Sequence, residues 1–117
     1  MAKAKIVLDD DGLFYGIKIL CPGCLFMGGS SIPHILWVKQ LPAGMKESPH
    51  AKNKPHWDWN GNLDKPTFRP SLLNYIDTPN GRRCHSWITD GCIEFLGDCT
   101  HALKGQTVDL PEITEEA

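Results

Sequence analysis

Two cysteines stand three positions apart in the segment Cys-Pro-Gly-Cys, residues 21–24. Thiolates at this spacing can both reach one metal ion from a tight turn, and Cys-x₂-Cys is a common zinc spacing. The competing interpretation is a redox pair, which is typical of the N-terminus of a long helix in an α/β unit. The glycines and serines of residues 28–31 disfavour such a helix. The metal interpretation of Cys21 and Cys24 is therefore preferred.

A tetrahedral zinc site needs two further ligands from elsewhere in the chain. The candidates are His34, Cys84, Cys99 and His101. His34 and Cys84 each start a predicted strand, where a metal can hold neighbouring strands together. Each could equally be a buried residue without a metal. Four protein ligands, two of them thiolates, would make the zinc structural, whereas a catalytic zinc predicts three protein ligands and a water.

A hydroxyl, an imidazole and a carboxylate could form a second site. A serine becomes nucleophilic when an adjacent base accepts its proton and a third group orients that base. Ser71 follows the proline-flanked segment 66–70, whose stiffness could fix its position, and His85 is a suitable base. Asp98 or His101 could orient the imidazole. The alternative is that these are ordinary strand, turn and surface residues, because such triads are defined by geometry and not by order.

The dipeptide Asp90-Gly91 determines how these groups are presented. It lies between two β-prone runs, and Asp-Gly favours a two-residue type I′ hairpin turn. The predicted register runs from residue 89 opposite 92 to residue 85 opposite 96. Successive side chains of a strand point to opposite faces. Cys84 and His85 must therefore face in opposite directions, the thiol toward a metal and the imidazole toward an alcohol.

The remaining elements are short strands separated by turn residues. No sustained 3.6-residue pattern indicates a long helix, so a mainly β fold is predicted, with a small α+β arrangement as the alternative. We expect one zinc-stabilised domain of antiparallel strands and hairpins over residues 1–117, with a flexible tail at 112–117. Besides the hairpin, the predicted strands are Lys5–Leu8, Leu13–Leu20, Ile32–Val38, Lys65–Ile76 and Gln106–Leu110.

Three segments need separate interpretation. The prolines of 65–76 predict a sheet edge or an irregular strand, because proline cannot donate to a ladder. Residues 41–56 are rich in proline and charge and predict an exposed irregular loop. Beside it, Trp57 and Trp59 could pack in the core or serve surface recognition. Residues 100–104 predict one helical turn ended by Gly105.

Composition restricts the classes of function. The chain has 117 residues and a formal net charge of −2, which gives no electrostatic reason to expect a nucleic-acid partner. No apolar run approaches the ~20 residues of a membrane span, and the N-terminus does not resemble a signal peptide. We expect a cytoplasmic protein. Its five cysteines, an odd number, then argue against a disulfide framework.

An ordered series of motifs resembles a known family. The series is Cys-Pro-Gly-Cys, a histidine before an apolar strand, Trp-x-x-Asn-Gly, Pro-Thr-Phe-x-Pro-Ser-Leu, Cys-His-x-Trp-Ile-x-Asp-Gly and Asp-x-Thr-His-Ala-Leu-x-Gly-Gln-Thr-Val, over residues 18–111. It is similar to a domain-of-unknown-function family that is frequent in phages and prophages and often mislabelled as ammonia monooxygenase. Related domains in bacterial operons for ubiquitin-like conjugation look like peptidases that process the ubiquitin-like protein.

The resemblance implies two sets of site residues. Its metal positions fall on Cys21, Cys24, His34 and Cys84. Its catalytic positions fall on Ser71, His85, Asp98 and His101. Cys99 stands where relatives can carry serine, which argues against an essential ligand there.

The leading hypothesis is therefore a zinc-stabilised hydrolase. It would be a serine-type peptidase that acts on a protein or peptide, such as a ubiquitin-like precursor, with no nucleic acid and no membrane as partner. The rival is a non-catalytic structural-zinc module of phage origin that binds a protein. In the rival, Ser71 would lie away from any histidine.

Overall fold

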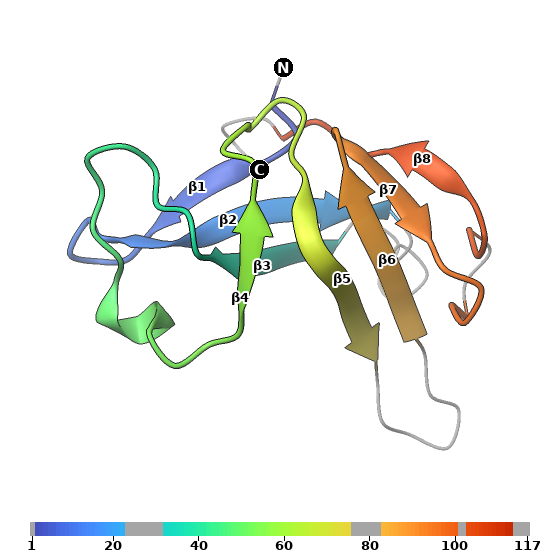
Figure 1. Ribbon diagram of the computed structural model, residues 1–117, viewed down its shortest axis with the longest axis horizontal. Helices are drawn as coiled ribbons and strands as arrows, with labels where there is room; N and C mark the ends of the chain where they lie inside the picture. The colour runs from blue at the N-terminus through green and yellow to red at the C-terminus, as the bar shows by residue number, and fades with distance from the viewer. Residues whose placement is uncertain (1, 23–31, 76–82, 101–102, 114–117) are drawn as a thin grey trace.

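Eight short strands are the main elements of the structure, as expected for a mainly β chain (Figure 1). The computed structural model describes residues 2–22, 32–75, 83–100 and 103–113. The strands are β1 (Lys5–Leu8), β2 (Phe14–Cys21), β3 (Ile32–Val38), β4 (His56–Trp59), β5 (Phe68–Tyr75), β6 (Arg83–Thr89), β7 (Cys92–Phe95) and β8 (Thr107–Asp109), and a 3-10 turn, η2, spans Pro49–Ala51.

The strands form one curled sheet in which spatial order follows chain order, from β1 to β8. Neighbouring strands are antiparallel except β3 and β4, which run parallel. In Figure 1, β1–β3 run across the view, whereas β5 and β6 run steeply across them, and the short β4 connects the two halves. The curl brings the ends of the chain together, since Ile113 N donates to Ala2 O at 2.8 Å. Ile113 is thus buried at the start of the expected tail, whose residues 114–117 lie outside the described part.

The predicted hairpin is confirmed. Asp90 and Gly91 have φ values of 49° and 78°, the left-handed conformation that a type I′ turn requires at both positions. The observed pairs run from Thr89 opposite Cys92 to Ser86 opposite Phe95. Leu96 N then donates to His85 O at 2.9 Å, which extends the predicted register.

The expectation that residues 65–76 lie at a sheet edge is wrong, and the irregular alternative is correct. β5 lies between β4 and β6. Phe68 is opposite Ile88 and Leu72 is opposite Ser86, so four steps along β5 match two along β6. The two extra residues form a bulge. This bulge places Pro70 where a ladder hydrogen bond is not needed.

The segment 41–56 is more ordered than the sequence suggests. Ser48 and Ala51 are fully buried, and Ser48 Oγ accepts from His50 N at the start of η2. Ser48 N also donates to Phe14 O, which attaches the segment to β2. The segment is therefore attached to the sheet at these points, while most of its residues are exposed, as the sequence predicts. The helical turn expected at 100–104 includes residues outside the described part.

Close packing between β2 and β3 gives a test of the fold. A Cβ on Gly16 would lie 2.7 Å from Ile35 Cγ2 and 2.9 Å from Leu36 O. We predict that Gly16→Ala lowers the free energy of unfolding by about 1–3 kcal/mol, because the backbone of β3 must shift. Urea unfolding measures this. The control is Gly97→Ala, whose Cβ meets nothing within 4 Å among the described residues. Equal effects of the two variants would contradict the observed packing.

Candidate active site

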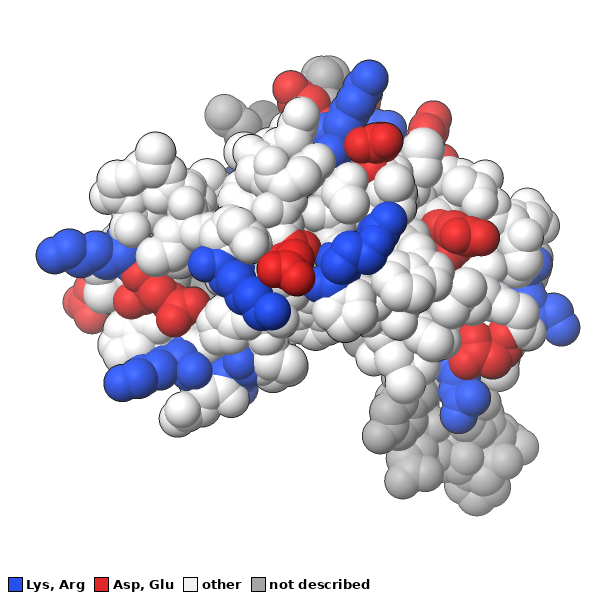
Figure 2. All heavy atoms as spheres, in the orientation of Figure 1, with Lys and Arg blue, Asp and Glu red and all other residues white. Residues whose placement is uncertain are grey.

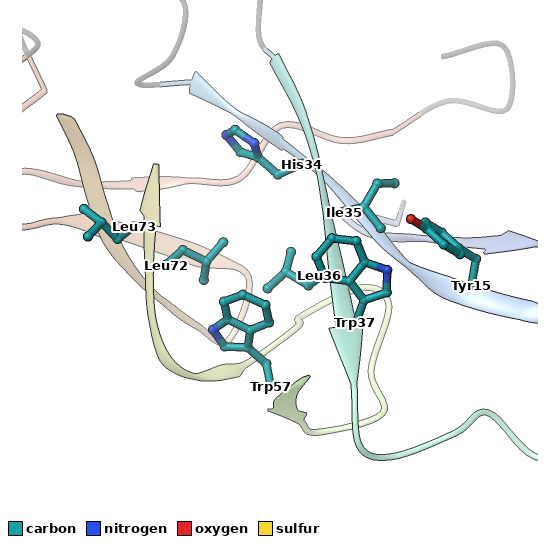
Figure 3. Close-up of a pocket in the computed structure, with 8 residues that line it drawn as sticks. All are labelled: Tyr15, His34, Ile35, Leu36, Trp37, Trp57, Leu72 and Leu73. Atoms are coloured by element: carbon teal, nitrogen blue, oxygen red, sulfur yellow. The ribbon is translucent and has the colours of Figure 1, made fainter. Parts of the chain in front are cut away.

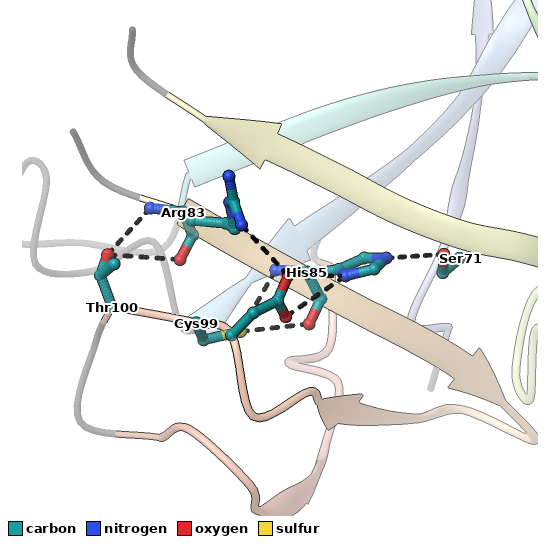
Figure 4. Close-up of polar contacts among 6 residues, drawn as sticks. Ser71, Arg83, His85, Cys99 and Thr100 are labelled. Atoms are coloured by element: carbon teal, nitrogen blue, oxygen red, sulfur yellow. Dashed lines mark hydrogen bonds and ion pairs between the residues drawn. The ribbon is translucent and has the colours of Figure 1, made fainter. Parts of the chain in front are cut away.

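Ser71 and His85 meet on the outer side of the β5–β6 pair. Ser71 Oγ lies 2.8 Å from His85 Nε2. Leu73, two residues after Ser71, is directly opposite His85, and alternate residues of a strand share a face. The bulge in β5 therefore places Ser71 on the same side of the sheet as the imidazole. Figure 4 shows the two side chains pointing toward each other.

Asp98 completes the contact chain on the other side of the imidazole. His85 Nδ1 lies 3.1 Å from Asp98 Oδ2 and 3.3 Å from Oδ1. The carboxylate can only accept, so Nδ1–H donates to it and Nε2 is left to accept from the Ser71 hydroxyl. The side chains of His85 and Asp98 are 25% and 41% exposed. The three groups therefore have the connectivity of a nucleophile, a base and an orienting acid, and they can be reached from solvent.

A loop after β7 carries Asp98, and two side chains attach this loop to β6 (Figure 4). The Cys99 thiol accepts from His85 N at 3.2 Å and donates to His85 O at 3.1 Å. Thr100 makes the matching pair of bonds to Arg83, two residues before His85 on β6. Its hydroxyl accepts from Arg83 N at 2.8 Å and donates to Arg83 O at 3.4 Å. The backbone groups beside the His85 imidazole are thus satisfied by the loop that supplies Asp98.

Arg83 is a second contact of this carboxylate. Its Nη1 lies 3.6 Å from Asp98 Oδ2, and its side chain is about half exposed. An exposed pair of this kind contributes little to stability. Its geometric effect is to hold the carboxylate between two donors.

The opposite face of β6 carries the buried thiol. Cys84 Sγ lies 3.5 Å from Cys21 Sγ, well beyond the ~2.05 Å of a disulfide bond. Cys84 and His85 therefore face in opposite directions, as the hairpin register requires. His34 is opposite Ile19 on the β2–β3 pair. Among the described residues, no three potential ligand groups gather closely enough to hold a metal. Cys24 and His101 lie outside the described residues.

Two residues support Ser71 without having been singled out for that role. Trp57 Nε1 donates to Ser71 O at 3.4 Å. The Arg69 guanidinium donates to Phe68 O and Ile88 O at 2.8 and 2.9 Å, and it lies 5.2 Å from the ring centroid of Trp87. Arg69 thereby bonds carbonyls on both strands at the bulge. Trp57 also packs against the core, and its role in surface recognition stays a prediction. Nothing in the local sequence indicates the Arg69 contacts.

Charge on the surface is mixed. On the face seen in Figure 2, basic and acidic side chains alternate over the described residues and do not gather by sign. Such a face does not produce the single-sign field that steers a strongly charged partner. Among the described residues, no helix has the length and apolarity to span a bilayer.

Comparison with known families shows to which family the chain belongs. The family model described as bacterial ubiquitination-like system serine protease (BubE) matches residues 2–96. The chain belongs to this family. The matched segment contains Ser71 and His85, and Asp98 follows just beyond its end. Neither the curated proteins nor the solved structures give a match. Membership of the BubE family agrees with the expected link to ubiquitin-like systems, and a phage origin stays a prediction.

The Cys99 contacts give a test of how this BubE chain holds its histidine. We predict that Cys99→Ala lowers the free energy of unfolding by about 1–3 kcal/mol, because the partly buried backbone N–H of His85 loses its partner. Cys99→Ser keeps a donor and an acceptor and should cost less. Urea unfolding compares both with Cys92→Ala, whose thiol is only half-buried on β7. A Cys99→Ala chain as stable as the natural one would contradict this role.

Proposed function

We propose that the chain is a serine peptidase in which Ser71 is the nucleophile, His85 the general base and Asp98 the residue that orients it. One observation carries the proposal: the continuous contact from Ser71 Oγ through both ring nitrogens of His85 to the Asp98 carboxylate. The nucleophile–base distance of 2.8 Å lies within the 2.6–3.2 Å that proton transfer requires. The family description supports the same chemistry.

The proposed reaction is acyl transfer to serine followed by hydrolysis. Ser71 Oγ bonds to the substrate carbonyl carbon while its proton passes to His85 Nε2. The carbon–nitrogen bond then breaks, and the imidazolium gives that proton to the leaving amine. Water attacks the acyl ester, again through His85, and restores the Ser71 hydroxyl while releasing a carboxylate product. Asp98 stays ionised and stabilises the imidazolium throughout.

The substrate in this proposal is a protein of the ubiquitin-like class. Its basis is the family description, which names a ubiquitination-like system. Cleavage would remove residues that follow the C-terminus of the ubiquitin-like protein or release it from a conjugate. Both reactions use the same attack on a carbonyl.

The rival hypothesis, a non-catalytic binding module, fits less well. It requires no contact between a serine and a histidine, yet Ser71 and His85 are hydrogen-bonded at a solvent-accessible position. His101 was the alternative orienting group, and Asp98 is the group in contact with Nδ1. We therefore assign that role to Asp98 in the mechanism.

Substitution of the nucleophile is the direct test. We predict that Ser71→Ala lowers kcat by about 10⁴-fold or more, because the attacking group is lost, and that Asp98→Asn lowers it by about 10⁴-fold. The assay is mass spectrometry of a ubiquitin-like protein that carries a C-terminal extension.

The control for this test is Thr107→Ala, which removes an exposed hydroxyl on β8 and should leave turnover unchanged. Circular dichroism checks that each variant is folded. A fluorophosphonate probe should modify the natural chain at Ser71. Unchanged turnover in Ser71→Ala would remove this residue from the mechanism.

We also propose that a structural zinc ion is held by Cys21, Cys24, His34 and Cys84 on the side of β6 that faces away from His85. The two described thiols fit such a site. In a tetrahedral site with Zn–S bonds of about 2.3 Å, two thiolates lie about 3.8 Å apart, close to the observed 3.5 Å. The ion would hold β2 and β6 together across the sheet and stabilise a small core.

Metal analysis tests this zinc proposal separately from catalysis. We expect about one zinc per purified chain by plasma mass spectrometry, and loss of zinc with a lower melting temperature in Cys84→Ser. Cys92→Ser is the matched control and should keep the metal, because Cys92 lies on β7 and donates to Asp109. A natural chain without zinc, or a Cys84→Ser variant with full zinc, would refute the proposal.

A further inference from the structure

A cavity of about 340 Å³ lies between β3 and β5 (Figure 3). Its size is within the range of small-molecule and side-chain binding sites. Its lining residues are Tyr15, His34, Ile35, Leu36, Trp37, Trp57, Leu72 and Leu73. The close-up shows Trp57 and Leu72 on one side and Leu36 on the other, facing one another.

The cavity is adjacent to the proposed nucleophile. Leu72 and Leu73 directly follow Ser71 in β5, and Trp57 both lines the cavity and donates to Ser71 O at 3.4 Å. Leu73 is two residues from Ser71, which is about 7 Å along a strand. A substrate side chain in the cavity therefore belongs to a residue within about two positions of the carbonyl that Ser71 attacks.

The short β4 explains why the sheet opens at this place. β4 pairs with β3 only through Trp37 and Val38, and with β5 only through Phe68 and Arg69. β4 begins at His56. Beyond this end of β4 no strand lies between β3 and β5 in the described part of the chain, so the two strands separate there. The cavity occupies this separation, which makes it a property of the sheet and not of a single side-chain rotamer.

The chemistry of the lining selects an apolar occupant. Six of its eight residues are leucine, isoleucine or tryptophan, and none is Asp, Glu, Lys or Arg. Leu73 is 48% exposed beside Ser71, and covering an exposed apolar side chain with an apolar ligand lowers the free energy of the complex. Lys54 Nζ lies 5.4 Å from the ring centroid of Trp37, and its positive charge disfavours a basic side chain there.

We propose that this cavity is a specificity pocket that binds a bulky apolar side chain, such as leucine, methionine or phenylalanine, within two residues of the scissile bond. The inference rests on the proposed function for the role of Ser71. It adds the substrate class: a chain whose cleavage point is marked by a large apolar residue and not by small residues alone.

Peptide cleavage tests the pocket. Matched fluorogenic peptides carry leucine or alanine at each of the two positions on either side of the scissile bond in turn. At one of these positions we expect leucine to raise kcat/KM at least about tenfold over alanine, since each added methylene favours the larger side chain. Leu73→Arg should remove this preference. Leu8→Arg is the matched control, because Leu8 is equally exposed, at 50%, but lies on β1. An unchanged preference in Leu73→Arg, or no preference in the natural chain, would overturn the proposal.

Binding without turnover separates this proposal from the peptidase proposal. In Ser71→Ala, an uncleaved leucine-containing peptide should shift the NMR signal of the Trp57 indole N–H, and the alanine peptide should do so at least about tenfold more weakly. If the leucine peptide shifts this signal but the natural chain cleaves no peptide, the peptidase proposal is refuted and the cavity stands as a pocket that binds apolar peptides. Equal binding of both peptides, or no shift at Trp57, would refute the pocket even if cleavage occurs.

Discussion

The structure depends on the strict alternation of side chains along β6. Cys84, Ser86 and Ile88 are buried on one face, whereas His85 lies on the other. A slip of one residue would exchange the two sets and put an imidazole in the core. The two-residue turn at Asp90-Gly91 prevents this, because both of its residues are left-handed and such a turn fixes the pairing register of β6 with β7. One tight turn therefore determines both which groups support the core and which face away from it, toward solvent.

The bulge in β5 is the second requirement. A regular strand would have kept one residue of β5 opposite each residue of β6, whereas the two extra residues allow Leu72 to stay in the core while Ser71 reaches His85. Bulges leave polar backbone groups without ladder partners. Arg69 bonds two carbonyls at this point, and Trp57 bonds the carbonyl of Ser71. These contacts hold the irregularity in place, as the proposed role of Ser71 as nucleophile requires.

Local sequence patterns predicted the hairpin, its register and the opposed faces of Cys84 and His85, because turn chemistry and side-chain alternation are local properties. The pairing of Ser71 with His85 was also expected, from the proline-flanked approach to Ser71, the face that His85 occupies and the family resemblance. The position of β5 inside the sheet was not predicted, since prolines indicate irregularity but do not show which strands flank it. The docking of Cys99 and Thr100 on β6 and the cavity beside Ser71 depend on how the whole sheet curls. No window of sequence contains that information.

A small chain can hold a precise site only if few of its parts are free to move. Two of the three contacting side chains, Ser71 and His85, are on paired strands, and the third is on a loop whose next residue bonds His85 itself through the Cys99 thiol. Displacement of this loop would therefore break the bonds of the imidazole's own backbone at the same time as its bond to Asp98. The same loop therefore orients the His85 imidazole and is attached to the backbone of His85. This double attachment lets a short loop keep Asp98 and His85 within the tolerance of about 0.5 Å that the proposed catalysis requires.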